Sequence, residues 1–309
     1  MIWKPSRRKL IVGGAALVAS PSIIRAQVGQ IPAWPPTQFI SSGGGFSGAY
    51  EGIGSIAASN WYGLRAFSAA KAAAKANLFK IVDSAGANSL IVTCNTSGDI
   101  DSTVIAGWAG TGSMFVNYVY DQAGTLDINS TNGNSFNPQL VLSPSGITAG
   151  KYALKFSGAQ HLFRSGGGIT VSNPWGTNIC FTATVNNTAP WCDDNNSAIF
   201  WNTTPALAGN STGSVLPVSA GVTQGTFYSG SQLNPDTTHD SIYVNGTLTS
   251  VTGTGFPSNW TSSFPAIGVG SFASGLTGYV LEWGIWPSTA AGGQTWTGLS
   301  SNQRSYWGF

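Results

Sequence analysis

Acidic side chains that could carry chemistry are few in this chain, which has 11 aspartates and glutamates among 309 residues. Two of them, Asp193 and Asp194, are adjacent in the segment APWCDDNNSAIFWN, between Trp191 and Trp201. Indole rings can cover the apolar face of a sugar while carboxylates bind its hydroxyl groups. Glycoside hydrolases use two carboxyl groups about 5–10 Å apart, but neighbouring side chains on a strand point to opposite faces. The segment is therefore a candidate sugar-binding site, with a solvated polar turn as the alternative interpretation.

Other patterns that could mark a catalytic or metal site are weaker. The segment GNSTG at residues 209–213 matches the G-x-S-x-G motif of hydrolases, but no strand before it and no helix after it is predicted, which favours a polar loop. Residues 127–134 are rich in oxygen ligands and leave calcium open, although the glutamate that completes an EF-hand loop is missing. Two histidines and no Cys-x-x-Cys pair argue against structural zinc. We expect no cofactor, with calcium as the one alternative.

The three cysteines allow at most one internal disulfide. Cys180 and Cys192 are close enough in sequence to bridge neighbouring strands in an oxidising compartment. Buried free thiols are the alternative, because cysteine packs as a small apolar residue. Both interpretations stay open at the level of sequence.

The N-terminal segment has the features of an export signal. Arg7 and Arg8 follow Ser6, an apolar run covers residues 10–19, and Ala26 closes the segment. These features predict a signal peptide over residues 1–26, of the twin-arginine type, and a periplasmic or secreted protein, with cleavage left open. The apolar run is shorter than the about 20 residues of a membrane-spanning helix, so we expect no integral membrane span after processing.

The charge balance argues against a nucleic-acid partner. Cleavage after Ala26 would remove five of the 13 basic residues and leave eight against 11 acidic ones, a net charge of −3. Nucleic-acid binding needs a basic footprint, which this balance does not supply.

Behind the signal, the patterning predicts a single β-rich domain. Prolines and glycines make residues 27–50 an extended lead-in, and residues 60–76 carry apolar side chains at helical spacing. From Leu78 onward the period changes to two in several short segments, and Asn245-Gly246 is a hairpin signal. At 42% apolar residues the chain can bury a core. We therefore expect an all-β sandwich over residues 51–309, with one short helix near its start.

Four segments in this order carry a family resemblance: WYGLR at 61–65, the turn DSAG at 83–86, YDQAG at 120–124 and NPQLV at 137–141. Together they resemble the catalytic domain of fungal and bacterial α-L-arabinofuranosidase B, which shows Tyr-Asp-Gln-Ser-Gly at the third place. The resemblance covers about residues 55–309 and implies a concanavalin-like, laminin-G-like jelly-roll β-sandwich.

The family's catalytic positions, carried over one at a time, do not match. The segment FYSGS at 227–231 is similar to the family's Leu-Phe-Ser-Gly-Ser, which places Gln224 where the nucleophilic glutamate would be, and the acid position falls near Ser271. Neither side chain can perform these roles in a retaining mechanism. Trp191-Cys192 is at the place of a vicinal cysteine pair that lines the family's sugar site. This implies a sugar site with Trp191, Cys192, Asp193 and Trp201, and it leaves Asp193, Asp194 and Asp236 as displaced carboxylates.

The resemblance implies an exported carbohydrate-active domain that acts on or binds arabinose-containing or related polysaccharide, with a glycan as its partner. Because the catalytic positions are replaced, it is open whether the protein is an arabinofuranosidase-type enzyme. The alternatives are a non-catalytic, lectin-like glycan-binding module and a part of a surface assembly, and the oligomeric state is open. We expect Asp121 to hold its turn by accepting backbone N–H bonds and to take no part in catalysis.

Overall fold

β-Strands make up most of the structure, a computed structural model that describes residues 46–110, 112–130, 134–163, 169–172, 175–185, 188–192, 197–201, 207–211, 214–217, 222–234, 240–252, 259–262, 266–268, 274–287 and 293–309. The strands form an all-β jelly-roll sandwich, which confirms the predicted fold class. Among the described ladders, the pairing of β11 with β20 (Ser274–Gly275) is parallel and the others are antiparallel.

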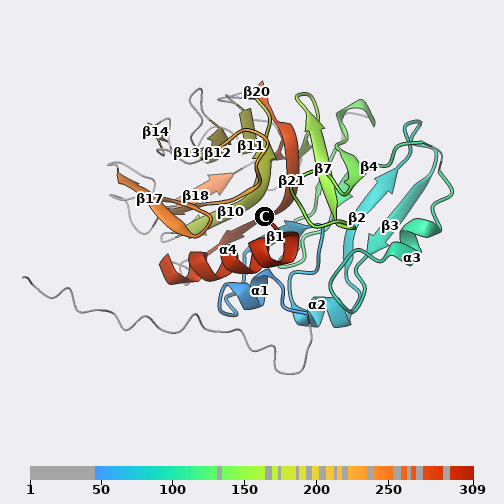
Figure 1. Ribbon diagram of the computed structural model, residues 1–309, viewed down its shortest axis with the longest axis horizontal. Helices are drawn as coiled ribbons and strands as arrows, with labels where there is room; N and C mark the ends of the chain where they lie inside the picture. The colour runs from blue at the N-terminus through green and yellow to red at the C-terminus, as the bar shows by residue number, and fades with distance from the viewer. Residues whose placement is uncertain are drawn as a thin grey trace, which may run out of the picture. The chain divides into compact units, whose positions relative to one another are not determined.

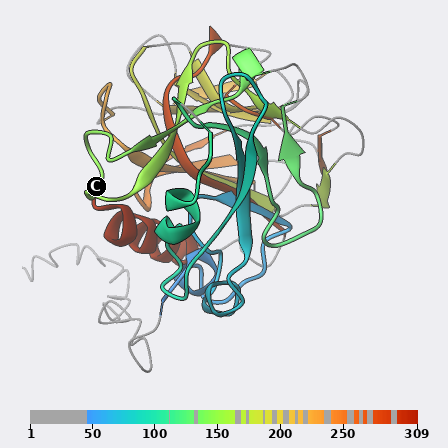
Figure 2. The same ribbon diagram turned by 90° about the vertical axis from the view of Figure 1, so that its right-hand side faces the viewer.

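The first sheet runs from one end of the domain to the other, with β2–β4 at one end and β11–β14 at the other (Figure 1). Its strands, in spatial order, are β3 (Ser89–Thr93), β2 (Asn77–Val82), β4 (Phe115–Val119), β5 (Ile128–Asn129), β8 (Leu162–Phe163), β19 (Ala266–Ile267), β11 (Thr188–Cys192), β12 (Ser197–Trp201), β13 (Leu207–Ser211) and β14 (Ser214–Pro217). The end formed by β2 and β3 faces the viewer in Figure 2.

The second sheet is built around two long strands, β10 and β21, which pair with each other over most of their length. Its strands are β6 (Gln139–Leu142), β7 (Tyr152–Ser157), β21 (Thr277–Trp286), β1 (Asn60–Gly63), β10 (Trp175–Ala183), β15 (Tyr228–Asn234), β16 (Asp240–Val244) and β17 (Thr247–Thr252). One pair, Phe115 with Gln139, joins the two sheets through β4 and β6. A separate ribbon is formed by β9 (Ile169–Ser172) and β18 (Asn259–Ser262).

The predicted helix over residues 60–76 is wrong in its first half. Residues Asn60–Gly63 are the buried strand β1, which pairs with β21 from Ile285 to Glu282. Aromatic residues such as Trp61 pack well on a sheet surface, and the tertiary contact with β21 outweighs the helical spacing. Helix forms only in the short α2 (Ala69–Ala73), where the Ser68 hydroxyl caps the helix by accepting from Lys71 N at 3.2 Å.

A longer helix that the sequence analysis did not predict closes the chain. Helix α4 (Gly293–Trp307) lies next to α1 (Ala49–Gly52) and covers part of the second sheet (Figure 1). Its buried side chains recur every three to four residues, at Trp296, Leu299, Gln303 and Trp307. The remaining helical pieces are α3 (Ser102–Ala106) and the 3-10 turn η1 (Asn134–Phe136). In the described part of the chain, no helix is long and apolar enough to cross a membrane.

The core contains two of the three cysteines as free thiols. Cys94 and Cys180 are both buried and unbridged, so the possible disulfide between Cys180 and Cys192 is not formed. The register explains this, because Cys180 lies on β10 opposite Ser229 and Glu282 of the second sheet. Cys192 instead lies on β11 of the first sheet, opposite Ala198 and Ala266.

The sequence suggested a polar loop for the segment GNSTG, and this prediction is wrong. Its first three residues end β13, which forms a hairpin with β14, and Asn210 pairs with Val215. A hairpin lacks the helix that a nucleophile elbow requires after the serine, so the motif has no catalytic context here.

Candidate functional site

The position assigned to the family's nucleophile is an exposed turn at the end of β10. Gln224 and Gly225 form this turn, and Gly225 N donates to Ala183 O, at the last residue of β10, over 2.9 Å. Ala183 pairs with Gly278 of β21. The amide of Gln224 therefore lies at the edge of the sandwich where β10 leads into β11.

Strand β11 connects the other predicted sugar-site positions. Trp191 pairs with Ile267, Cys192 pairs with Ala266, and Thr188 pairs with both Trp201 and Ser274. Ser271 lies outside the described residues, but the strands before and after it, β19 and β20, both pair with β11. The backbone thus brings Trp191, Cys192, Trp201 and both flanks of Ser271 to neighbouring strands, close to the end of β10.

The three candidate displaced carboxylates, Asp193, Asp194 and Asp236, also lie outside the described residues. Asp193 and Asp194 directly follow Cys192, the last residue of β11. Asp236 follows the end of β15, where Asn234 pairs with Trp175. All three carboxylates therefore stay predictions.

Carboxylates whose side chains are described are all engaged in structural contacts. Asp83 holds a turn by accepting from Ala87 N and from the Asn88 side-chain amide, which lowers the pKa of Asp83. Asp101 caps α3, and its hydrogen bonds with Thr103 lower its pKa. The same holds for the others, which are Glu51, Asp99, Asp121, Asp127 and Glu282. Within the described residues, no cluster of three His, Cys, Asp or Glu side chains could hold a metal ion.

The carboxylate of Asp121 is enclosed by N–H donors and is almost fully buried. Oδ1 accepts from Trp61 N, Ala123 N and Gly124 N at 2.9–3.1 Å, and Oδ2 accepts from Leu126 N at 3.1 Å and from the Asn60 amide at 2.5 Å. A Cβ at Gly124 would lie 2.6 Å from Asp121 Oδ2, so a larger residue does not fit there. This geometry joins the turn to β1 and leaves the carboxylate no approach to a substrate.

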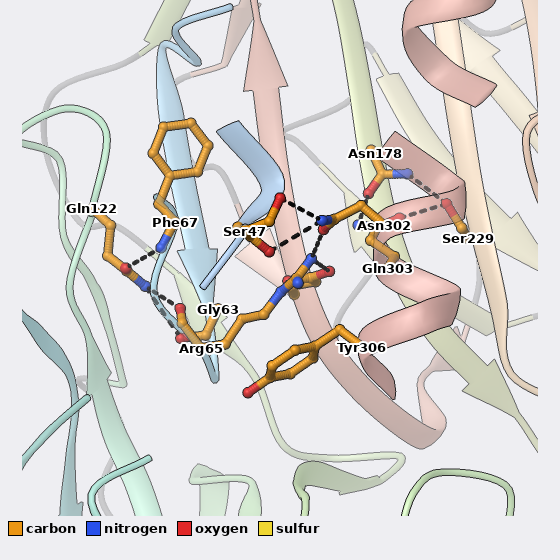
Figure 3. A network of polar contacts seen from close by, with 12 residues as sticks. Ser47, Gly63, Arg65, Phe67, Gln122, Asn178, Ser229, Asn302, Gln303 and Tyr306 are labelled. Carbon is orange, nitrogen blue, oxygen red and sulfur yellow. Dashed lines mark hydrogen bonds and ion pairs between the residues drawn. The ribbon is translucent and has the colours of Figure 1, made fainter. Parts of the chain in front are cut away.

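Gln122, the next residue, fixes the segment between β1 and α2. Its Oε1 accepts from Phe67 N at 2.8 Å, and its Nε2 donates to Arg65 O at 3.0 Å (Figure 3). Both ends of the amide thus bond to the backbone, which holds the Gln122 side chain against this segment. The segment YDQAG, which carries the resemblance, is thus used to join two parts of the scaffold.

A fully buried ion pair connects this segment to α4. Arg65 Nε donates to Glu282 Oε2 at 2.8 Å, and Nη2 donates to Glu282 Oε1 at 3.0 Å. Nη2 also donates to Asn302 Oδ1 at 2.7 Å (Figure 3). Both side chains of the pair have no exposed surface. The Tyr306 ring lies 4.4 Å from the Arg65 guanidinium carbon. Glu282, a charge within the apolar strand β21, was the one sequence signal for this pair.

Tyr306 continues the network to the surface. Its hydroxyl donates to Asp99, which also accepts from Lys151. Burial and the hydrogen bond to Asp99 raise the pKa of Tyr306 above its ordinary range. With Leu64, Ile100 and Trp307, these residues line a small cleft at the end of α4. Since its charged groups are already paired with each other, the cleft serves to attach α4.

A second buried network holds the middle of α4. Gln303 Nε2 donates to Asn178 Oδ1 and Gln303 Oε1 accepts from the Ser229 hydroxyl, both at 2.6 Å (Figure 3). Asn178 Nδ2 in turn donates to Ser229 Oγ at 3.0 Å and Ser231 Oγ at 2.9 Å. These contacts fix β10 and β15, and with them the strand ends that frame the Gln224 turn.

Comparison with known proteins finds similarity in structure only. No protein-family model matches the sequence, and no curated protein matches it. Solved structures do match: a GH54 α-L-arabinofuranosidase soaked with a cyclic sulfate inhibitor has a TM-score of 0.66 at 12% identity, covering 82% of this chain and 63% of that chain. An arabinofuranosidase complexed with arabinofuranosyl-α-1,2-xylobiose has a TM-score of 0.64 at 13% identity, covering 82% and 64%.

The chain has a glycoside-hydrolase-like fold. A third similar structure, with a TM-score of 0.64 and 12% identity, is a glutamate-to-glutamine mutant of a GH54 α-L-arabinofuranosidase soaked with 4-nitrophenyl α-L-arabinofuranoside. This chain spans slightly less than two thirds of the length of each of these arabinofuranosidases. At such low identity the match establishes the arabinofuranosidase-like sandwich, and the chemistry has to be argued from the residues of this chain.

Proposed function

We propose that this chain is an exported glycan-binding domain built on the catalytic scaffold of α-L-arabinofuranosidase B, and that it binds arabinose-containing or related polysaccharide without cleaving it. The observation that carries the proposal is the Gln224 turn on an arabinofuranosidase-like sandwich. An amide at this place cannot attack the anomeric carbon, and a serine near the acid position cannot protonate the leaving group.

Two further observations support binding over catalysis. Each carboxylate whose side chain is described has a structural partner, so this part of the chain offers no replacement pair. The predicted sugar-site positions Trp191, Cys192 and Trp201 nevertheless lie on the neighbouring strands β11 and β12, and β11 follows β10, whose last residue accepts from the Gln224 turn. The periplasmic or secreted location follows from the signal sequence at residues 1–26, which we propose directs twin-arginine export.

Binding and hydrolysis are tested side by side on the mature protein. Affinity electrophoresis with branched arabinan and with arabinoxylan should show retardation, while 4-nitrophenyl α-L-arabinofuranoside should release no nitrophenol from pH 4 to 7. Trp191→Ala should abolish the retardation. Absence of binding to either polysaccharide would refute the proposed function, and release of nitrophenol would refute the loss of catalysis.

The assignment of the two replaced positions has its own test. The double variant Gln224→Glu/Ser271→Asp should gain measurable hydrolysis of 4-nitrophenyl α-L-arabinofuranoside, because it restores both carboxyl groups of a retaining mechanism. Gln224→Glu alone is the matched control and should stay far less active. A double variant that folds, binds arabinan and remains inactive would contradict the placement of these two positions.

A hydrolase with displaced carboxylates is the second candidate function. It is favoured by one observation, the position of Asp193 and Asp194 directly after β11, whose neighbours β19 and β20 flank Ser271. In that case the wild-type protein would release nitrophenol, and Asp193→Asn or Asp194→Asn would abolish the release.

A further inference from the structure

A group of aromatic side chains lies on the outer face of the first sheet, beyond the predicted sugar site. The rings of Tyr118 and Tyr120 are 4.9 Å apart. The His161 ring lies 5.3 Å from that of Phe136 and 5.2 Å from that of Phe163. All five side chains are partly exposed. We call these five residues the aromatic platform.

The strand register places both parts of the platform on one face. Tyr118 of β4 lies opposite Asn129 of β5, which lies opposite Phe163 of β8. Directly opposite residues on neighbouring strands share a face. The other face of these strands carries Val119, Ile128 and Leu162, which are buried in the core. With strands about 4.8 Å apart, the two aromatic groups are separated by about 10 Å.

The same cross-strand row leads to the proposed sugar site. Phe163 lies opposite Ala266 of β19, and Ala266 lies opposite Cys192 of β11. The row therefore connects the platform to the backbone position of Cys192. Trp191 belongs to the neighbouring row, with Ile267 and Leu162, which are buried in the core.

The polar groups of the platform suit hydroxyl groups rather than charges. Tyr120 Oη makes no hydrogen bond with a described residue, and burial followed by the nearby Asp127 carboxylate raises the pKa of Tyr120, which keeps it a donor.

The platform is preorganised by the segment that marks the scaffold. Asp127 Oδ2 accepts from the Tyr118 hydroxyl at 2.6 Å, and its Oδ1 accepts from Asp121 N at 2.8 Å. On the other side, His161 N donates to Phe136 O at 2.9 Å. Rings held in this way lose little conformational freedom on binding, which favours affinity.

We propose that the aromatic platform is a further contact surface for a neutral polysaccharide, on which sugar rings stack by their C–H faces while a hydroxyl group meets Tyr120. This rests on the proposed function, because it adds a second contact surface for the same polysaccharide. A polyanion does not fit, since Lys80, opposite Tyr118, is the single cation in the cross-strand row and Asp127 offsets it. The negative face of an aromatic ring attracts the slightly positive C–H face of a sugar.

Affinity electrophoresis with branched arabinan and arabinoxylan tests the platform through two variants, Tyr120→Ala and Phe163→Ala. Each should weaken retardation at least tenfold while keeping the thermal midpoint within a few degrees of the wild type. Tyr152→Ala, at a partly exposed tyrosine of β7 in the second sheet, is the matched control and should bind like the wild type.

The outcomes separate this inference from the proposed function. If the wild type binds and both platform variants bind equally well while Trp191→Ala does not, the platform is refuted and the glycan-binding function stands. If the wild type binds neither polysaccharide, both are refuted. Sedimentation that shows a dimer lost in Phe163→Ala would instead assign this face to a second copy of the chain, and would also overturn the inference.

Discussion

The buried pair of Arg65 and Glu282 gives the sharpest test of how α4 is attached. Replacement of Glu282 by glutamine keeps the shape of the side chain and removes its charge. Arg65 would then stay buried without a counter-charge, and the glutamine NH2 would replace one of the two oxygens that accept from Arg65. Loss of one partner of a buried pair costs about 3–5 kcal/mol, because an uncompensated charge is left in the interior.

In a domain of this size, such a loss lowers the thermal midpoint by roughly 6–20 °C. Urea unfolding, followed by tryptophan fluorescence, measures the free energy directly, since six tryptophans among the described residues are buried in the core. The double variant Arg65→Met/Glu282→Met should be more stable than either single variant, because an apolar pair of similar volume avoids the desolvation cost.

A second ion pair on the same network supplies the control. Lys151 and Asp99 have side-chain exposures of 20% and 38%, so water screens their attraction. Lys151→Met should therefore cost no more than about 1 kcal/mol. If Glu282→Gln unfolds within about 1 kcal/mol of the wild type, the reasoning from burial is refuted.

Three further predictions follow from other buried groups. Asp121→Ala leaves four backbone N–H groups and the Asn60 amide without their acceptor. It should therefore lower the free energy of unfolding in urea by at least about 3 kcal/mol. An unchanged midpoint would show that the turn does not depend on the carboxylate. Burial raises the pKa of the Cys180 thiol well above its ordinary value. Cys180 should therefore not react with a thiol reagent at pH 8 until the protein unfolds. Rapid labelling of Cys180 in the native protein would contradict its burial. The folded state also raises the pKa of Tyr306, so the stability that Tyr306 contributes is fully present below the unfolded pKa near 10 and falls as pH rises above it. Tyr306→Phe should reduce that fall by up to about 1.4 kcal/mol per pH unit. An identical slope of stability against pH in the variant would contradict this prediction.

The fold class was accessible from sequence because it depends on local periodicity. The change to a two-residue period after residue 77 and the Asn245-Gly246 turn correspond to β2 and to the hairpin of β16 and β17. Residues 60–76 misled the prediction, since alanine-rich spacing outweighed Trp61, Tyr62 and Gly63, whose strand state depends on pairing with β21. Helix α4 was missed because its glycine, serine and threonine residues weaken the helical signal, although its buried positions recur at helical spacing.

The site was less accessible because its contacts are long-range. Arg65 and Glu282 are 217 residues apart, and no local pattern could pair them. The aromatic platform combines residues of β4, β8 and η1 that only the strand register brings together. The resemblance named Gln224, Trp191 and Cys192 for the sugar site. Gln224 lies in the turn next to the last residue of β10 and the other two lie on β11, and their role in sugar binding stays a prediction.

The family-like segment YDQAG makes structural contacts that do not depend on whether the protein cleaves a sugar. The polar side-chain atoms of Asp121 and Gln122 form hydrogen bonds with backbone groups of β1, of the turn itself and of the chain leading to α2. Substitution at either residue would expose unsatisfied donors in the core, so the motif is constrained by folding whether or not a sugar is cleaved. Gln224, by contrast, is exposed at a turn, where substitutions usually cost less than in the core. A match confined to such scaffold residues predicts the sandwich well and predicts hydrolysis poorly.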